Sequence, residues 1–106
     1  MVSSVDVSIE TEADGGCVVK LQTPTWELNV RASAAEFIRL AIIRQADWNA
    51  RESLAVGEAV GARTFWSSDG QMAAIAVGTD DETWDAAFTV PVDVVNEIVR
   101  LAASYA

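Results

Sequence analysis

Four carboxylates fall within six residues in the last third of the chain: Asp80, Asp81, Glu82 and Asp85. Oxygen ligands at this density can attract a divalent cation or a basic protein surface. Crowded like charges cost folding stability, which favours a functional use, although a solvated turn is the commoner explanation. Trp84 lies inside the cluster, and an aromatic residue beside carboxylates is typical of interfaces that face arginine-rich partners. The cluster, with Asp69 as a further candidate, predicts a binding surface for a basic protein.

Two other segments match a calcium-binding or a catalytic motif only in part. A calcium-loop pattern begins at Glu10 and runs through Gly15, but its twelfth position, which should supply a bidentate glutamate, is Leu21. The run Ser67–Asp69 resembles a nucleophile cluster, yet the chain has no histidine or suitably placed lysine to activate a serine. We therefore expect no catalytic residue, no metal and no cofactor.

The amino-acid composition also argues against catalysis. The chain has no histidine, one cysteine (Cys17) and one lysine (Lys20), although these three residue types supply most general bases, nucleophiles and soft metal ligands. Paired carboxylates, as in glycosidases, are the chemistry left in quantity, and nothing singles out a pair. The sequence therefore predicts a binding protein and not an enzyme.

The charge balance narrows the class of partner. Sixteen acidic residues against seven basic ones give a net charge of −9. Nucleic-acid backbones and anionic lipid surfaces both require a positive protein surface, so neither is an expected partner. The longest unbroken apolar run, Met72 to Val77, is far below the roughly 20 residues that cross a bilayer. The N-terminus lacks a secretion signal, so we expect a cytoplasmic protein whose partner is basic.

The first half of the sequence predicts three strands and a helix. Alternating apolar residues predict strands over 5–9, 17–21 and 26–30, with a hairpin turn at Gly15 and Gly16 between the first two. Ser33 and Glu36 form a capping box, which predicts that a helix starts there and ends near Asp47 or Trp48. Its apolar stripe is formed by Phe37, Ile38, Ala41, Ile42, Gln45 and Trp48.

The second half predicts three or four strands and a C-terminal helix. Residues 49–59 are read as a strand, although the helix could also continue there. An Asp69–Gly70 turn between the apolar runs 63–67 and 72–77 predicts a hairpin. Trp84, Ala86, Phe88 and Val90 alternate as a further strand, which places Trp84 toward the core. Pro91 suits a helix start, before an apolar stripe of Val94, Val95, Ile98, Leu101, Ala102 and Tyr105.

The adjacent aromatics Phe65 and Trp66 supply the best indication of a contact surface. In a strand they must point to opposite faces of the sheet, so one of them is exposed or covered by a partner. The other tryptophans, Trp26 and Trp48, lie on apolar periodic faces and are expected in the core with their indole N–H groups bonded.

These elements predict one domain over residues 1–106, of the α+β class, with an antiparallel sheet of six to seven strands and two helices packed on one face. The leading functional hypothesis is a small acidic inhibitor that occludes a basic protein, as an immunity protein does with a bacterial toxin. The alternatives are a homodimeric scaffold that buries the exposed sheet face between subunits, and a small-ligand-binding domain lined by tryptophan.

Overall fold

The computed structural model describes residues 5–80 and 84–105, and over these residues seven strands form one antiparallel sheet in which sequence neighbours are also neighbours in space. The strands are β1 (Asp6–Thr11), β2 (Cys17–Gln22), β3 (Glu27–Ala32), β4 (Leu54–Ala59), β5 (Ala62–Ser68), β6 (Met72–Gly78) and β7 (Trp84–Pro91). The helical segments are α1 (Ala34–Ile38), the 3₁₀ helices η1 (Arg39–Gln45) and η2 (Trp48–Ala50), and α2 (Val92–Ala103). The predicted α+β class and element order are confirmed.

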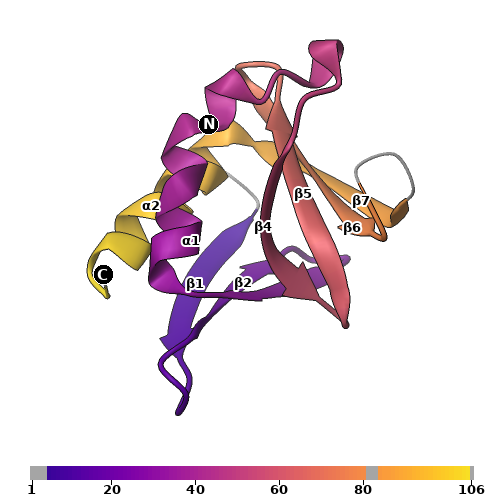
Figure 1. Cartoon of the computed structure of the whole chain (residues 1–106). Helices are drawn as coiled ribbons and strands as arrows, with labels where there is room; N and C mark the ends of the chain where they lie inside the picture. Colours follow the sequence, from indigo (N-terminus) through magenta and orange to yellow (C-terminus); the bar gives the residue numbers. More distant parts are fainter. Residues whose placement is uncertain (1–4, 81–83, 106) are drawn as a thin grey trace.

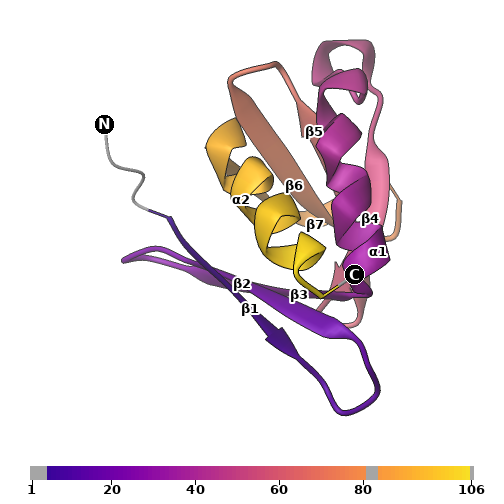
Figure 2. The same ribbon diagram turned by 90° about the vertical axis from the view of Figure 1, so that its left-hand side faces the viewer.

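The sheet bends around its helices. Helices α1 and α2 lie side by side in contact with each other (Figure 1). Figure 2 shows β1–β3 spread along one side of this helix pair, while β4–β7 rise along another. The core fills the space between helices and sheet, and its largest fully buried side chains are Trp66, Phe37, Leu21, Leu40, Ile43, Ile75 and Ile98.

The bend lies at the junction of β3 with β4, where the strand register consists of the Arg31–Glu58 pair. A bulge between Ala55 and Glu58 brings Gly57 close to β3 with a φ of +76°. A Cβ atom built on Gly57 would lie 2.7 Å from the backbone oxygen of Arg31 and 2.8 Å from Cγ1 of Val30. Glycine is therefore required here both by its backbone angle and by the space available.

Helix α1 begins as predicted, because the Ser33 hydroxyl accepts a hydrogen bond from the Glu36 backbone N–H at 3.1 Å. The predicted apolar stripe is wrong beyond Ile38, which is half-buried and packs against the core. After Ile38 the chain tightens into η1, where side chains recur every third residue. The buried residues follow that period, so the exposed fraction of Ile42 is 46%, and the residues that face the core are Phe37, Leu40, Ile43 and Ala46.

Helix α2 buries the expected face, since Val94, Val95 and Ile98 are all buried. Pro91 lies one position earlier than predicted, as the residue that precedes the helix and ends β7. Tyr105 follows the helix and is 49% exposed, so the predicted stripe stops before it. Among the helices in residues 5–80 and 84–105, none combines the length and apolar character that a bilayer crossing requires.

Candidate functional site

The outer face of β5, β6 and β7 turns away from the helices. Phe65, Ala76 and Ala87 are register partners across these three strands, and they alternate with core residues such as Trp66 and Ile75. Side chains of successive strand residues point to opposite faces. The row therefore lies on the outer face, and its side chains become smaller from Phe65 on β5 to the alanines on β6 and β7.

The loop between η1 and β4, residues 46–53, lies beside the last residue of β5 and borders this row. Asp47 organises the loop: its carboxylate accepts from the Asn49 N–H at 2.9 Å, and its carbonyl accepts from the Glu52 N–H at 3.0 Å. A backbone bond from Ser68 N–H to the Ala46 carbonyl, 2.9 Å long, ties the loop to β5. These bonds hold Trp48 in η2 at the margin of the outer face, where its exposed fraction is 36%.

Trp84 forms the facing wall at the start of β7. The register between β6 and β7 shifts between Val77 and Gly78, so Trp84 pairs with Gly78 two residues before the ordinary alternation resumes at Ala86. The prediction that Trp84 lies toward the core is wrong, because this shift turns its side chain to the outer face, where it is 49% exposed. Ala86 is likewise exposed.

Together these residues enclose an aromatic cleft of about 620 Å³. Its walls are Trp48, Phe65 and Trp84, its floor is Ala74, Ala76 and Ala87, and its rim carries Arg51, Glu52, Ser53 and Ser67. Because the lining residues on β6 and β7 between these aromatics are alanines, little side-chain volume separates a partner's side chain from the strand backbone. This composition, mostly apolar with a few charged groups at the rim, is typical of a binding site.

The structure assigns the two predicted interface aromatics to different places. Phe65 is the outward one and lines the aromatic cleft. Trp66 has no exposed surface and its indole N–H donates to the Val56 carbonyl at 2.9 Å, so it belongs to the core and is not available to a partner. Of the remaining tryptophans, Trp26 is half-buried and packs on Phe88 with ring centroids 4.8 Å apart, whereas Trp48 is outside the core, contrary to prediction.

The predicted acidic residues do not form one surface. Asp69 lies in the turn before β6, whereas Asp80 follows the other end of β6 and Asp85 lies beside that end on β7. The seven residues of β6 span about 23 Å at roughly 3.3 Å per residue. Asp80 and Asp85 are exposed near Trp84, while Asp81 and Glu82 lie outside the described residues.

Asp69 has a structural task in its turn. Its carboxylate accepts from the backbone N–H groups of Met72 at 2.8 Å and Gln71 at 2.9 Å. These two bonds favour the charged form and lower the pKa of Asp69 below its ordinary value. The residue therefore stabilises the hairpin that joins β5 to β6, with both bonds made to its Oδ1 oxygen.

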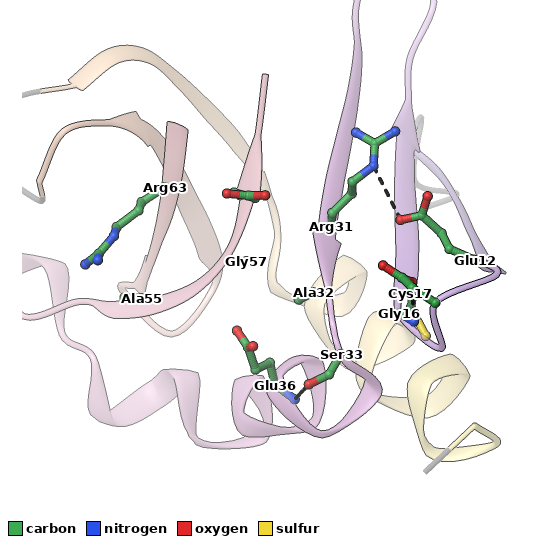
Figure 3. A pocket seen from close by; sticks show the side chains of 12 residues that line it. Glu12, Gly16, Cys17, Arg31, Ala32, Ser33, Glu36, Ala55, Gly57 and Arg63 are labelled. Carbon is green, nitrogen blue, oxygen red and sulfur yellow. Dashed lines mark hydrogen bonds and ion pairs between the residues drawn. The ribbon is translucent and has the colours of Figure 1, made fainter. Parts of the chain in front are cut away.

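A second pocket, of about 550 Å³, lies over the β3–β4 junction and is charged. Figure 3 shows Arg31 directed at Glu12, with which it forms an ion pair at 3.4 Å, and Arg63 on the opposite side of the pocket. The acidic and basic side chains that line it are exposed, and an exposed ion pair contributes only about 0 to 1 kcal/mol. Water therefore screens the carboxylates and guanidinium groups that line the pocket.

Within residues 5–80 and 84–105, no three or more histidine, cysteine, aspartate or glutamate side chains are grouped so that they could hold a metal ion. Cys17, the single cysteine, is buried beneath the charged pocket. Comparison with known proteins gave no match: no family model, no curated protein and no solved structure is significantly similar to this chain.

Sequence reasoning identified Phe65 and Trp84 but missed the rest of the aromatic cleft. Trp48 and Glu52 come from a loop whose path depends on the tertiary bond between Ala46 and Ser68. The alanines Ala74 and Ala76 on β6 could have predicted the cleft, because two small side chains on the outer face of a strand that is paired on both sides leave a hollow there.

Proposed function

We propose that this chain is an acidic protein-binding module that inhibits a basic partner by occluding its surface, in the manner of an immunity protein. The observation that carries the proposal is the aromatic cleft: two half-exposed tryptophans face each other across an alanine floor, on a sheet face that the helices leave open, in a chain of net charge −9.

The tryptophans supply the affinity. Trp48 and Trp84 keep 36% and 49% of their surface exposed in the free chain, and the burial of such surface by a partner is favourable. Interface residues that dominate binding energy are enriched in tryptophan and lie at the centre of a contact that excludes water. A partner's apolar or aromatic side chain, inserted over Ala76, would contact both walls.

The carboxylates select the partner by charge. Asp85 follows Trp84 directly, Asp80 lies in the adjoining turn, and Glu52 lies on the rim at the Trp48 end, where Arg51 is the one basic residue that lines the cleft. Charges around an apolar centre raise the association rate and exclude wrong partners more than they raise affinity. Lysines and arginines that flank the inserted side chain meet these acids.

Matched baits test the proposal. The tagged wild type, Ala76→Trp and Val60→Asn are used to capture proteins from a lysate of the source, at low and at moderate salt. Ala76→Trp fills the aromatic cleft, and Val60→Asn removes a 93% exposed apolar side chain outside it. The proposal predicts one basic protein retained by wild type and Val60→Asn, lost from Ala76→Trp and weakened by salt. Equal retention by all three baits would contradict it.

The cleft volume favours one second candidate, a small-ligand-binding domain. About 620 Å³ lies within the range of roughly 300 to 1,000 Å³ that small-molecule sites occupy. A compound that raises the melting temperature of the wild type and leaves that of Ala76→Trp unchanged would support this candidate. A broad panel without such a compound would remove it.

A further inference from the structure

The first half of β7 is open on both faces as well as along its edge. Trp84, Asp85, Ala86 and Ala87 are consecutive and all exposed, whereas Phe88 is half-buried and Val90 is buried. Ala86 pairs with the buried Val77 on the core face and Ala87 pairs with Ala76 on the outer face, so the described residues cover neither face there. β7 also ends the sheet that the described residues form, so its outer backbone groups face away from every strand in it.

The opposite edge of the same sheet is protected. On β1, the charged residues Asp6 and Glu10 are exposed, and they alternate with the half-buried Val7 and Ile9. Helix α2 also contacts β1, more extensively than it contacts β7. Charged side chains and covering elements are the usual means by which proteins prevent an edge strand from pairing with another chain.

β7 has few of these protections. Its register shift lies at Asp85 and its proline, Pro91, is the last residue of the strand, so residues 86–90 between them carry no charge and no proline. Its remaining side chains are apolar or small, which suits pairing with an added strand. The two edges therefore differ in charge, because β1 exposes Asp6 and Glu10 along its length whereas β7 has no charged residue after Asp85.

The aromatic cleft adjoins this edge, since Trp84 and Ala87 belong to both. The outer-face row from Phe65 through Ala76 to Ala87 continues to the position that an added strand would occupy, about 4.8 Å beyond β7. A side chain of that strand on the outer face would therefore lie against the cleft. Its neighbours along the strand would face the other way.

We propose that the partner binds through an extended segment that pairs with β7 as an added strand. This inference rests on the proposed function and names its binding mode: backbone bonds along residues 86–90 align the segment, and alternate side chains enter the aromatic cleft. The segment carries apolar or aromatic residues at every second position, with lysine or arginine near Asp85 and Glu52.

Charge decides between a partner's segment and a second copy of this chain. Two copies would bring together net charges of −9 each, with Asp85 in both edge strands. Like charges across an interface oppose association, whereas a basic segment is attracted. The edge is therefore assigned to the basic partner.

Random dodecapeptides displayed on phage supply the probe. They are selected on the wild-type chain and counter-selected on Ala76→Trp, so that the enriched sequences depend on the aromatic cleft. The enriched peptide is then synthesised with one backbone amide N-methylated at a time. Strand pairing predicts that affinity falls about tenfold at every second position and changes little between them, because alternate N–H groups of a strand face its neighbour.

Amide hydrogen exchange of the complex gives a second reading. In the free chain, every second amide from Ala86 to Val90, where the register with β6 is regular, faces the open edge and is expected to exchange fast. Strand addition predicts that these amides become protected when the peptide binds, with the two-residue period preserved. Protection without that period would overturn the added strand.

The outcomes separate the two proposals. Cleft-dependent peptides whose N-methyl scan lacks the two-residue period would overturn strand addition and leave the proposed function standing. Failure to enrich any cleft-dependent peptide would overturn both. A third outcome is that the free chain sediments as a dimer and the amides of β7 exchange fast only after dilution to monomer. This outcome would assign the edge to a second copy and overturn the inference.

Discussion

The indole Nε1 of Trp66 donates a hydrogen bond to the backbone oxygen of Val56 at 2.9 Å, and both residues have no exposed surface. The Thr64 hydroxyl donates to the same oxygen. Val56 lies in the bulge of β4, where the register with β5 shifts between Ala55 and Glu58. Two side chains of β5 thus satisfy a buried carbonyl at an irregularity in the strand ladder.

This shared acceptor predicts a non-additive pair of substitutions. Thr64→Val and Trp66→Phe should each lower the free energy of unfolding by about 1 to 3 kcal/mol, because each leaves one donor to the Val56 carbonyl. The double variant should lose more than the two losses together, because the buried carbonyl then has neither donor. Urea unfolding of the four proteins measures the coupling, and simple additivity would show that the donors act independently.

Gly57 should be far less tolerant of alanine than Gly61. Both have positive φ, +76° and +79°, but a Cβ at Gly61 meets nothing within 4 Å. Gly61→Ala therefore measures backbone strain, about 1 to 2 kcal/mol. Gly57→Ala should cost a further 1 to 3 kcal/mol or so, because β3 must move away from β4. Equal losses of unfolding free energy for the two variants would mean that β3 and β4 can separate enough to hold the added Cβ without destabilising the fold.

Val60→Asn is expected to stabilise the chain. Val60 and Gly61 join β4 to β5 with φ values of +45° and +79°, a pair of positive angles for which Asn-Gly is the preferred sequence. A β-branched residue is strained there, and the 93% exposed valine loses little packing when it is replaced. We expect a gain of about 1 kcal/mol in the free energy of unfolding. A loss would show that the valine side chain contributes contacts worth more than the strain.

Asp69 should make stability depend on pH. Because its pKa is lower in the folded chain, its stabilisation is fully present above the unfolded pKa of about 3.9 and is lost as the pH falls through the folded value. Wild type should therefore exceed Asp69→Asn in stability at pH 7, with a difference that shrinks as unfolding is measured at successively lower pH below about 4. A difference that does not change with pH would contradict this account of the turn.

Local sequence signals predicted most of the fold. Two-residue alternation located the strands, the Asp69–Gly70 pair located the turn before β6, and Ser33 with Glu36 located the start of α1. Each signal acts over a few residues. The physical causes, strand pleating and the capping of unsatisfied backbone groups, are equally local, so a single sequence contains them.

The errors came from features that tertiary structure decides. Trp84 was placed toward the core because strict alternation was assumed, and a register shift at Gly78 reverses that assignment. Trp48 was counted in a 3.6-residue stripe, although Phe37, Leu40, Ile43 and Ala46 repeat every third residue. For Phe65 and Trp66 the sequence established opposite faces, and only the position of the helices shows which face is buried.

The affinity of the captured basic partner for the wild type and for Trp84→Ala is the most direct test of the aromatic cleft. Trp84 is exposed in the free chain, so its removal should leave folding nearly unchanged, which melting temperature checks. Isothermal titration should give a dissociation constant at least about tenfold weaker for Trp84→Ala, with Val60→Asn equal to wild type. Equal affinity of Trp84→Ala and wild type would contradict the assignment of the cleft as the partner's binding site.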